Sequence, residues 1–92
     1  MDLSIPGADL IERGLRDVAR GVETVEALLV SIGAPRLRGL GLPIEHPFSS
    51  PERRLYDALA AKESDSAHSR YNGLIRRLVS FERAAECVTP RT

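Results

Sequence analysis

The most regular pattern in the chain is a pair of apolar stripes, one near each end of the sequence. Both stripes advance by alternating steps of four and three residues, and this spacing places their members on one face of an α-helix. Each face must be buried against another, so the pattern predicts an all-α protein: a small bundle of four to five helices in a single domain. The first stripe consists of Ile11, Leu15, Val18, Val22, Val25, Leu29 and Ile32, and the second of Ala67, Tyr71, Leu74, Leu78, Phe81, Ala85 and Val88.

The first stripe spans two expected helices, over residues 8–20 and 22–32, and Gly21 lies between them. A glycine that follows a basic last turn is a usual helix stop, in which case Thr24 caps a second helix. The spacing of the stripe nevertheless continues through Gly21, so one unbroken helix is the alternative.

The middle of the chain predicts a short helix over 35–39 and a linker over 41–50, because prolines and glycines interrupt the helical pattern there. Ile44 and Phe48 are the expected anchors of this linker in the core. The next helix is expected over 51–62, with Ser50 as its N-cap, Pro51 at its first position, and Leu55, Tyr56 and Leu59 facing inward.

The last helix is expected over residues 66–87 and a frayed tail over 89–92, where Pro90 cannot continue a helix. A helix of this length, about 33 Å, extends past the domain of so short a chain and leaves part of its apolar stripe exposed. The stripe therefore favours a homodimer, although the two stripes can also bury each other within a monomer.

The charge balance and the composition indicate which classes of partner and which cellular location to expect. The 13 basic and 13 acidic residues cancel, which removes the excess positive charge that attracts nucleic acid or an anionic membrane. All but one of the basic residues, Lys62, are arginines, a bias typical of a GC-rich bacterial genome. A lone cysteine, the lack of a leader pattern and the lack of a long apolar run predict a cytoplasmic protein.

No catalytic, cofactor-binding or metal-binding constellation is evident in the sequence. Two histidines, His46 and His68, and Cys87 are scattered, whereas a metal site needs several converging ligands. Glu82 and Glu86 lie four residues apart and can share an ion or a proton, but a solvated helix face is the favoured interpretation. An enzyme whose pocket forms only in an oligomer, from His68, Tyr71 and Glu82, is a less favoured hypothesis.

The sequence therefore predicts a non-enzymatic protein–protein interaction or oligomerisation module without a cofactor, metal or small-molecule ligand. Its expected partner is a second copy of the chain or another protein. The alternative function is an antitoxin-like or regulatory partner of an adjacently encoded effector, with weak nucleic-acid binding. The candidate interaction surface lies on the last helix and consists of Arg70, Tyr71, Leu74, Arg76, Arg77, Leu78, Phe81 and Arg83.

Overall fold

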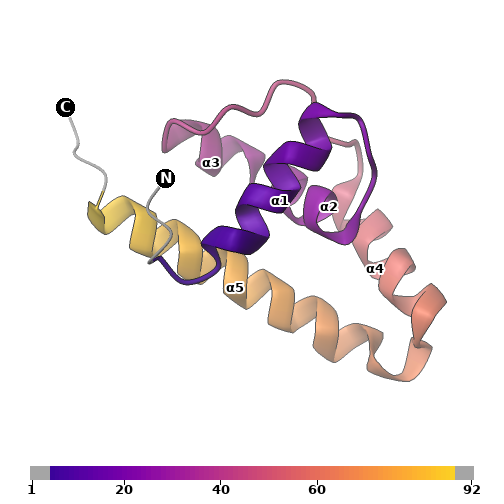
Figure 1. The fold of residues 1–92 in the computed structure, drawn as a ribbon. Coiled ribbons are helices and arrows are strands. Elements are labelled where there is room, and N and C mark those ends of the chain that lie inside the picture. Colours follow the sequence, from indigo (N-terminus) through magenta and orange to yellow (C-terminus); the bar gives the residue numbers. More distant parts are fainter. Residues whose placement is uncertain (1–4, 89–92) are drawn as a thin grey trace.

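Helices account for all the regular secondary structure in residues 5–88, the part of the chain that the computed structural model describes (Figure 1). This finding confirms the all-α prediction and the long C-terminal helix, while the expected tail over 89–92 lies outside the described residues. The elements are α1 (Ala8–Ala19), α2 (Val25–Ile32), α3 (Ala34–Gly39), α4 (Pro51–Lys62), the single 3-10 turn η1 (Ser64–Ser66) and α5 (Ala67–Val88).

Helix α1 ends before Gly21 and α2 begins after it, so the structure has two helices here and not one unbroken helix. Gly21 adopts a φ of +71°, a left-handed conformation that glycine reaches without the steric cost of a side chain. Thr24 then caps α2, because its Oγ1 accepts a hydrogen bond from the Ala27 amide at 3.1 Å. Val22 lies in the connecting turn and is 42% exposed, so its predicted place on the buried stripe is wrong.

Helix α2 is the centre of the core. Its residues Ala27–Ser31 are all buried, and α1, α3, α4 and α5 all contact it. Burying a leucine or valine side chain contributes about 1.5–3 kcal/mol, so Leu28, Leu29 and Val30, all fully buried, make α2 a large contributor to stability. A Cβ on Gly14 of α1 would overlap the Val30 side chain and the Glu26 carbonyl group, which shows how closely α1 and α2 approach.

The linker between α3 and α4 is anchored to the core at both expected positions. Ile44 is buried, and Phe48 packs against the core cluster while remaining half-buried. Hydrogen bonds hold both ends of the linker: Arg38 Nε donates to the Ile44 carbonyl oxygen at 2.6 Å, and the Phe48 amide donates to Ser31 Oγ at 3.0 Å.

Helix α4 begins at the expected residue, Pro51, but without the expected side-chain cap from Ser50. Ser50 is at the N-cap position with φ +46° and makes no capping hydrogen bond through its side chain. Its carbonyl oxygen instead accepts from the Arg54 amide at 3.1 Å. Leu55 and Leu59 are buried as predicted, whereas Tyr56 is 38% exposed, so the prediction that Tyr56 faces inward is wrong.

Helices α4 and α5 form an antiparallel hairpin that η1 connects. In Figure 1, α5 runs along the lower edge of the molecule beneath the other helices, and its first half extends with α4 to the right-hand end. The second half of α5 supplies Leu78, Phe81 and Ala85 to the core. Within residues 5–88, no helix is both long enough and apolar enough to cross a lipid bilayer.

Candidate functional site

The predicted interaction surface on α5 divides into buried and exposed parts. Leu78 and Phe81 belong to the core of the chain itself, so their side chains are not available to a partner in this conformation. Tyr71 and Leu74 are half-buried. The four arginines of the predicted surface, Arg70, Arg76, Arg77 and Arg83, are all exposed.

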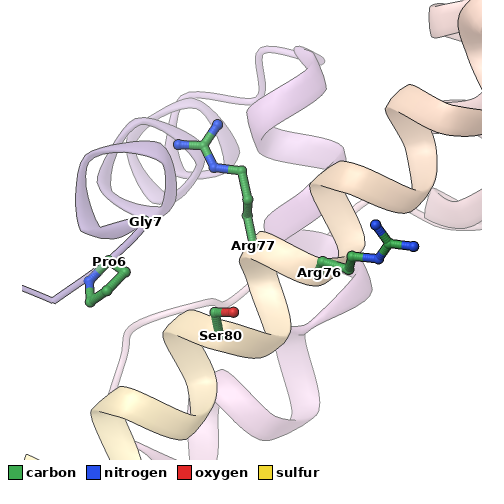
Figure 2. Close-up of a pocket in the computed structure, with 5 residues that line it drawn as sticks. All are labelled: Pro6, Gly7, Arg76, Arg77 and Ser80. Carbon is green, nitrogen blue, oxygen red and sulfur yellow. The ribbon is translucent and has the colours of Figure 1, made fainter.

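The arginines do not converge on one point. Arg76 and Arg77 line a shallow hollow of about 200 Å³ together with Pro6, Gly7 and Ser80. Figure 2 shows that Arg77 reaches from α5 toward the start of the chain, whereas Arg76 points away from it. Two diverging guanidinium groups do not clamp a single phosphate or carboxylate, which requires donors aimed at the same oxygen atoms.

Five apolar or aromatic side chains of the hairpin are at least partly exposed, and we call this set the hairpin strip: Tyr56, Ala60, Tyr71, Ile75 and Val79. The rings of Tyr56 and Tyr71 join α4 to α5 in an edge-to-face contact, with 5.9 Å between their centroids and 61° between their planes. Ala60 lies one turn beyond Tyr56, and Ile75 and Val79 lie one and two turns beyond Tyr71, so these side chains share one side of their helices. Tyr56 is exposed and the other four residues are half-buried.

Sequence reasoning missed most of the hairpin strip. The sequence pattern predicts Tyr71 in the interaction surface, but it predicts Tyr56 in the core and gives Ile75 and Val79 no role. The available signal was their spacing, because Ile75 and Val79 form an apolar line beside the core stripe of the same helix.

Polar side chains continue the line of Ile75 and Val79 toward both ends of α5. On the N-terminal side, Asn72 Nδ2 and His68 Nε2 lie 3.2 Å apart. On the C-terminal side are Glu82 and Glu86, and Arg36 of α3 approaches both carboxylates. Along α5, Ile75 and Val79 therefore lie between the pair of His68 and Asn72 and the acidic pair of Glu82 and Glu86.

Arg36 holds the acidic pair asymmetrically. Its Nη2 and Nε lie 2.6 Å and 2.8 Å from Oε1 of Glu86, whereas its Nη1 lies 3.9 Å from Oε1 of Glu82. Only 5% of Glu82 is exposed, so the expectation of a solvated face is wrong for this residue. Burial raises the pKa of the Glu82 carboxyl; the charge of Arg36 partly opposes this rise and the charge of Glu86 adds to it.

The residues of the hypothetical oligomeric enzyme are not brought together within one chain. His68 and Tyr71 are in the first turns of α5, whereas Glu82 is at least eleven residues further along the helix, a separation of about 16 Å. His46 is exposed in the linker and Cys87 is exposed near the end of α5. Among residues 5–88, no three side chains of the His, Cys, Asp or Glu type are grouped as ligands for a metal ion.

Two further hollows lie away from the hairpin strip. One, of about 420 Å³, separates α1 from the linker and is lined by Leu15, Val18, Pro43, His46 and three other residues. The other, of about 490 Å³, lies between α2, α4 and α5, and its lining mixes Glu23 and Glu26 with Lys62 and Arg70.

No family model, curated protein or solved structure matches this chain.

Proposed function

We propose that this protein is a non-enzymatic protein–protein interaction module that associates with a second copy of itself through the hairpin strip. The observation that carries the proposal is the Tyr56–Tyr71 pair, whose rings stand at the edge of the core with Tyr56 substantially exposed. Tyrosine is enriched in protein interfaces because it adds a large apolar area and a polar tip at small entropic cost.

The shape of the molecule supports this surface over others. A helical hairpin that associates with an identical hairpin produces a four-helix arrangement, one of the most stable ways to bury helical faces. The molecule measures 43 × 24 × 18 Å, so its long axis offers an extended side to a partner. A dimer with a two-fold axis uses the same patch on both copies, and the hairpin strip supplies such a patch from one contiguous pair of helices.

The charge balance supports a protein partner over nucleic acid. The formal net charge is zero at pH 7, so two copies approach each other without long-range repulsion. The exposed arginines are distributed around α5 and two of them diverge (Figure 2). This arrangement differs from the single basic face that binds a phosphate backbone.

The experiment compares the solution mass of the purified chain with that of two variants by light scattering over a concentration series. Tyr56→Glu places a charge in the hairpin strip, and Ala61→Glu places the same charge on the exposed opposite side of α4. We expect the wild type and Ala61→Glu to dimerise alike and Tyr56→Glu to weaken dimerisation about tenfold or more.

Circular dichroism melting of the two variants separates a lost interface from a lost fold. Equal melting of the monomeric forms, with dimerisation reduced only in Tyr56→Glu, supports the proposal. A wild type that stays monomeric at every concentration overturns it, as does a Tyr56→Glu variant that dimerises as well as Ala61→Glu.

A further inference from the structure

Helix α5 carries a second stripe with the spacing of a coiled-coil seam, beside the stripe that enters the core. Its six residues follow steps of four, three, four, three and four: His68, Asn72, Ile75, Val79, Glu82 and Glu86. Residues that repeat at this spacing face a neighbouring helix along their whole length. The core of the chain uses the other stripe. In the second stripe His68 is exposed and Asn72, Ile75, Val79 and Glu86 are half-buried, whereas Glu82 is buried within the chain.

The positions of the second stripe are symmetric in spacing about Arg77, so the stripe can pair with a second copy that runs in the opposite direction. His68 and Glu86 lie nine residues before and after Arg77, Asn72 and Glu82 lie five before and after it, and Ile75 and Val79 two. If two copies of α5 run antiparallel about a two-fold axis level with Arg77, the Ile75 and Val79 side chains meet at the centre. At both ends, His68 of one copy meets Glu86 of the other.

A parallel arrangement lacks this complementarity. Two parallel helices in register would set Glu86 against Glu86 and His68 against His68, and like groups opposed across a helical interface disfavour that pairing. The antiparallel arrangement instead opposes His68 to Glu86 at both ends of the stripe and apolar side chains at its centre.

Glu86 retains acceptor capacity for such a contact. Both short contacts from Arg36 end on Oε1 of Glu86, which leaves Oε2 of that carboxylate for another donor. Glu82 is more than nine-tenths buried within the chain, so Glu86 is the acidic residue that a second copy meets.

From this spacing and these contacts we infer that the second copy binds with its α5 antiparallel to α5 of the first, so that His68 faces Glu86 and Ile75 faces Val79 across the interface. The inference rests on the proposed self-association and adds the identity, direction and register of the contacts. Ile75 and Val79 belong both to this stripe and to the hairpin strip. The Tyr56–Tyr71 pair then flanks the partner helix on the side of α4.

Disulfide cross-linking tests the direction and register of the pairing. In a Cys87→Ser background, one preparation carries His68→Cys and another carries Glu86→Cys, and the two are mixed under mild oxidation. A disulfide needs Cα atoms within about 7 Å. Antiparallel pairing therefore predicts a mixed His68→Cys/Glu86→Cys product. It predicts no His68→Cys homodimer, because those positions lie about 27 Å apart along the axis.

Controls distinguish failure of this inference from failure of the proposed function. Ser69→Cys, on the exposed side of the same turn, is expected to give no product with Glu86→Cys. A His68→Cys homodimer, or no mixed product in a preparation of dimeric mass, overturns the antiparallel register and leaves self-association standing. A monomeric mass at every concentration overturns both.

A second pair of variants tests the same pairing while leaving the contact between Arg36 and Glu86 intact. His68→Glu brings a carboxylate opposite Glu86 of the other copy, and Ser69→Glu adds the same charge outside the stripe. We expect His68→Glu to weaken dimerisation about tenfold relative to Ser69→Glu. Equal dimerisation of these two variants overturns the proposed pairing.

Discussion

Arg36 and Glu86, fifty residues apart in the sequence, are joined by two contacts of 2.6 and 2.8 Å between one guanidinium group and one carboxylate oxygen. This ion pair fastens the short helix α3 to the last turns of α5. It also places a positive charge beside Glu82, which is buried one turn earlier on α5. Fold stability and the proposed dimer surface are therefore connected through the same side chain.

Replacing Arg36 with methionine is expected to destabilise the fold at neutral pH. Methionine keeps most of the aliphatic stem but removes the charge beside the buried Glu82 carboxylate, which raises the cost of keeping Glu82 ionised. We expect a loss of about 1–2 kcal/mol in the free energy of unfolding, measured by urea denaturation. Arg83→Met, at an exposed position on α5, is the matched control and should change stability by less than about 0.5 kcal/mol. Equal effects of the two substitutions would contradict this role of Arg36.

The buried Glu82 predicts a specific pH dependence of stability. Burial raises its pKa in the folded state above the ordinary value of 4.5, so the folded protein binds this proton more tightly than the unfolded chain does. The contribution of Glu82 is therefore fully present below pH 4.5 and is lost as the pH rises through the higher folded-state pKa.

The measurement for Glu82 is urea denaturation at a series of pH values for the wild type and Glu82→Gln. Glutamine cannot ionise, so the variant should lack this decline and gain stability relative to the wild type as the pH rises. Glu52→Gln, at an exposed position in α4, should retain the decline. A Glu82→Gln variant that loses stability relative to the wild type over the same pH range would show that the sign is wrong.

Gly14 and Gly73 form a matched pair that tests the α1–α2 contact. A Cβ at Gly14 meets the Val30 side chain and the Glu26 backbone, whereas a Cβ at Gly73 has no heavy atom of another element within 4 Å. Gly14→Ala is therefore expected to cost about 2 kcal/mol, because overpacking outweighs the gain in helix propensity. Gly73→Ala is expected to stabilise the protein by about 0.5–1 kcal/mol, and thermal melting of both variants gives the comparison. A stabilising Gly14→Ala would contradict the close approach of the two helices.

Thr24 is expected to contribute about 1–2 kcal/mol as the cap of α2. Its hydroxyl accepts from the Ala27 amide at 3.1 Å and donates to Asp17 Oδ2 at 2.8 Å, so it connects the end of α1 to the start of α2. Thr24→Ala removes both hydrogen bonds, whereas Thr24→Ser retains the hydroxyl and should keep most of the stability. Chemical denaturation of the two variants measures the difference, and equal stability would rule out a capping role.

The sequence predicted the helices well because their signals are local. Periodicity, the prolines in the first turns of α3 and α4, and the glycine after α1 all act within a few residues, and each corresponds to a helix or boundary in the structure. The errors arose where tertiary contacts decide the outcome. Val22 has the spacing of a buried residue but lies in a turn, and Tyr56 lies next to a buried leucine but faces the flank of the hairpin.

The surface features were less predictable for the same reason. Nothing local indicates that Arg36 and Glu86 meet, since fifty residues separate them. The burial of Glu82 depends on how α3 lies against α5, because a Cβ on Gly33, the residue before α3, would lie 3.1 Å from Oε2 of Glu82. Leu78 and Phe81 were expected in the interaction surface because their stripe was correctly identified, but that stripe is used within the chain.

The most direct test of the account is sedimentation equilibrium of the wild-type chain, because both proposals require self-association. Self-association predicts a concentration-dependent rise from the monomer mass of 10.1 kDa to twice that value. The hairpin strip would then be the first surface to substitute. A mass of 10.1 kDa at every concentration would contradict the central claim.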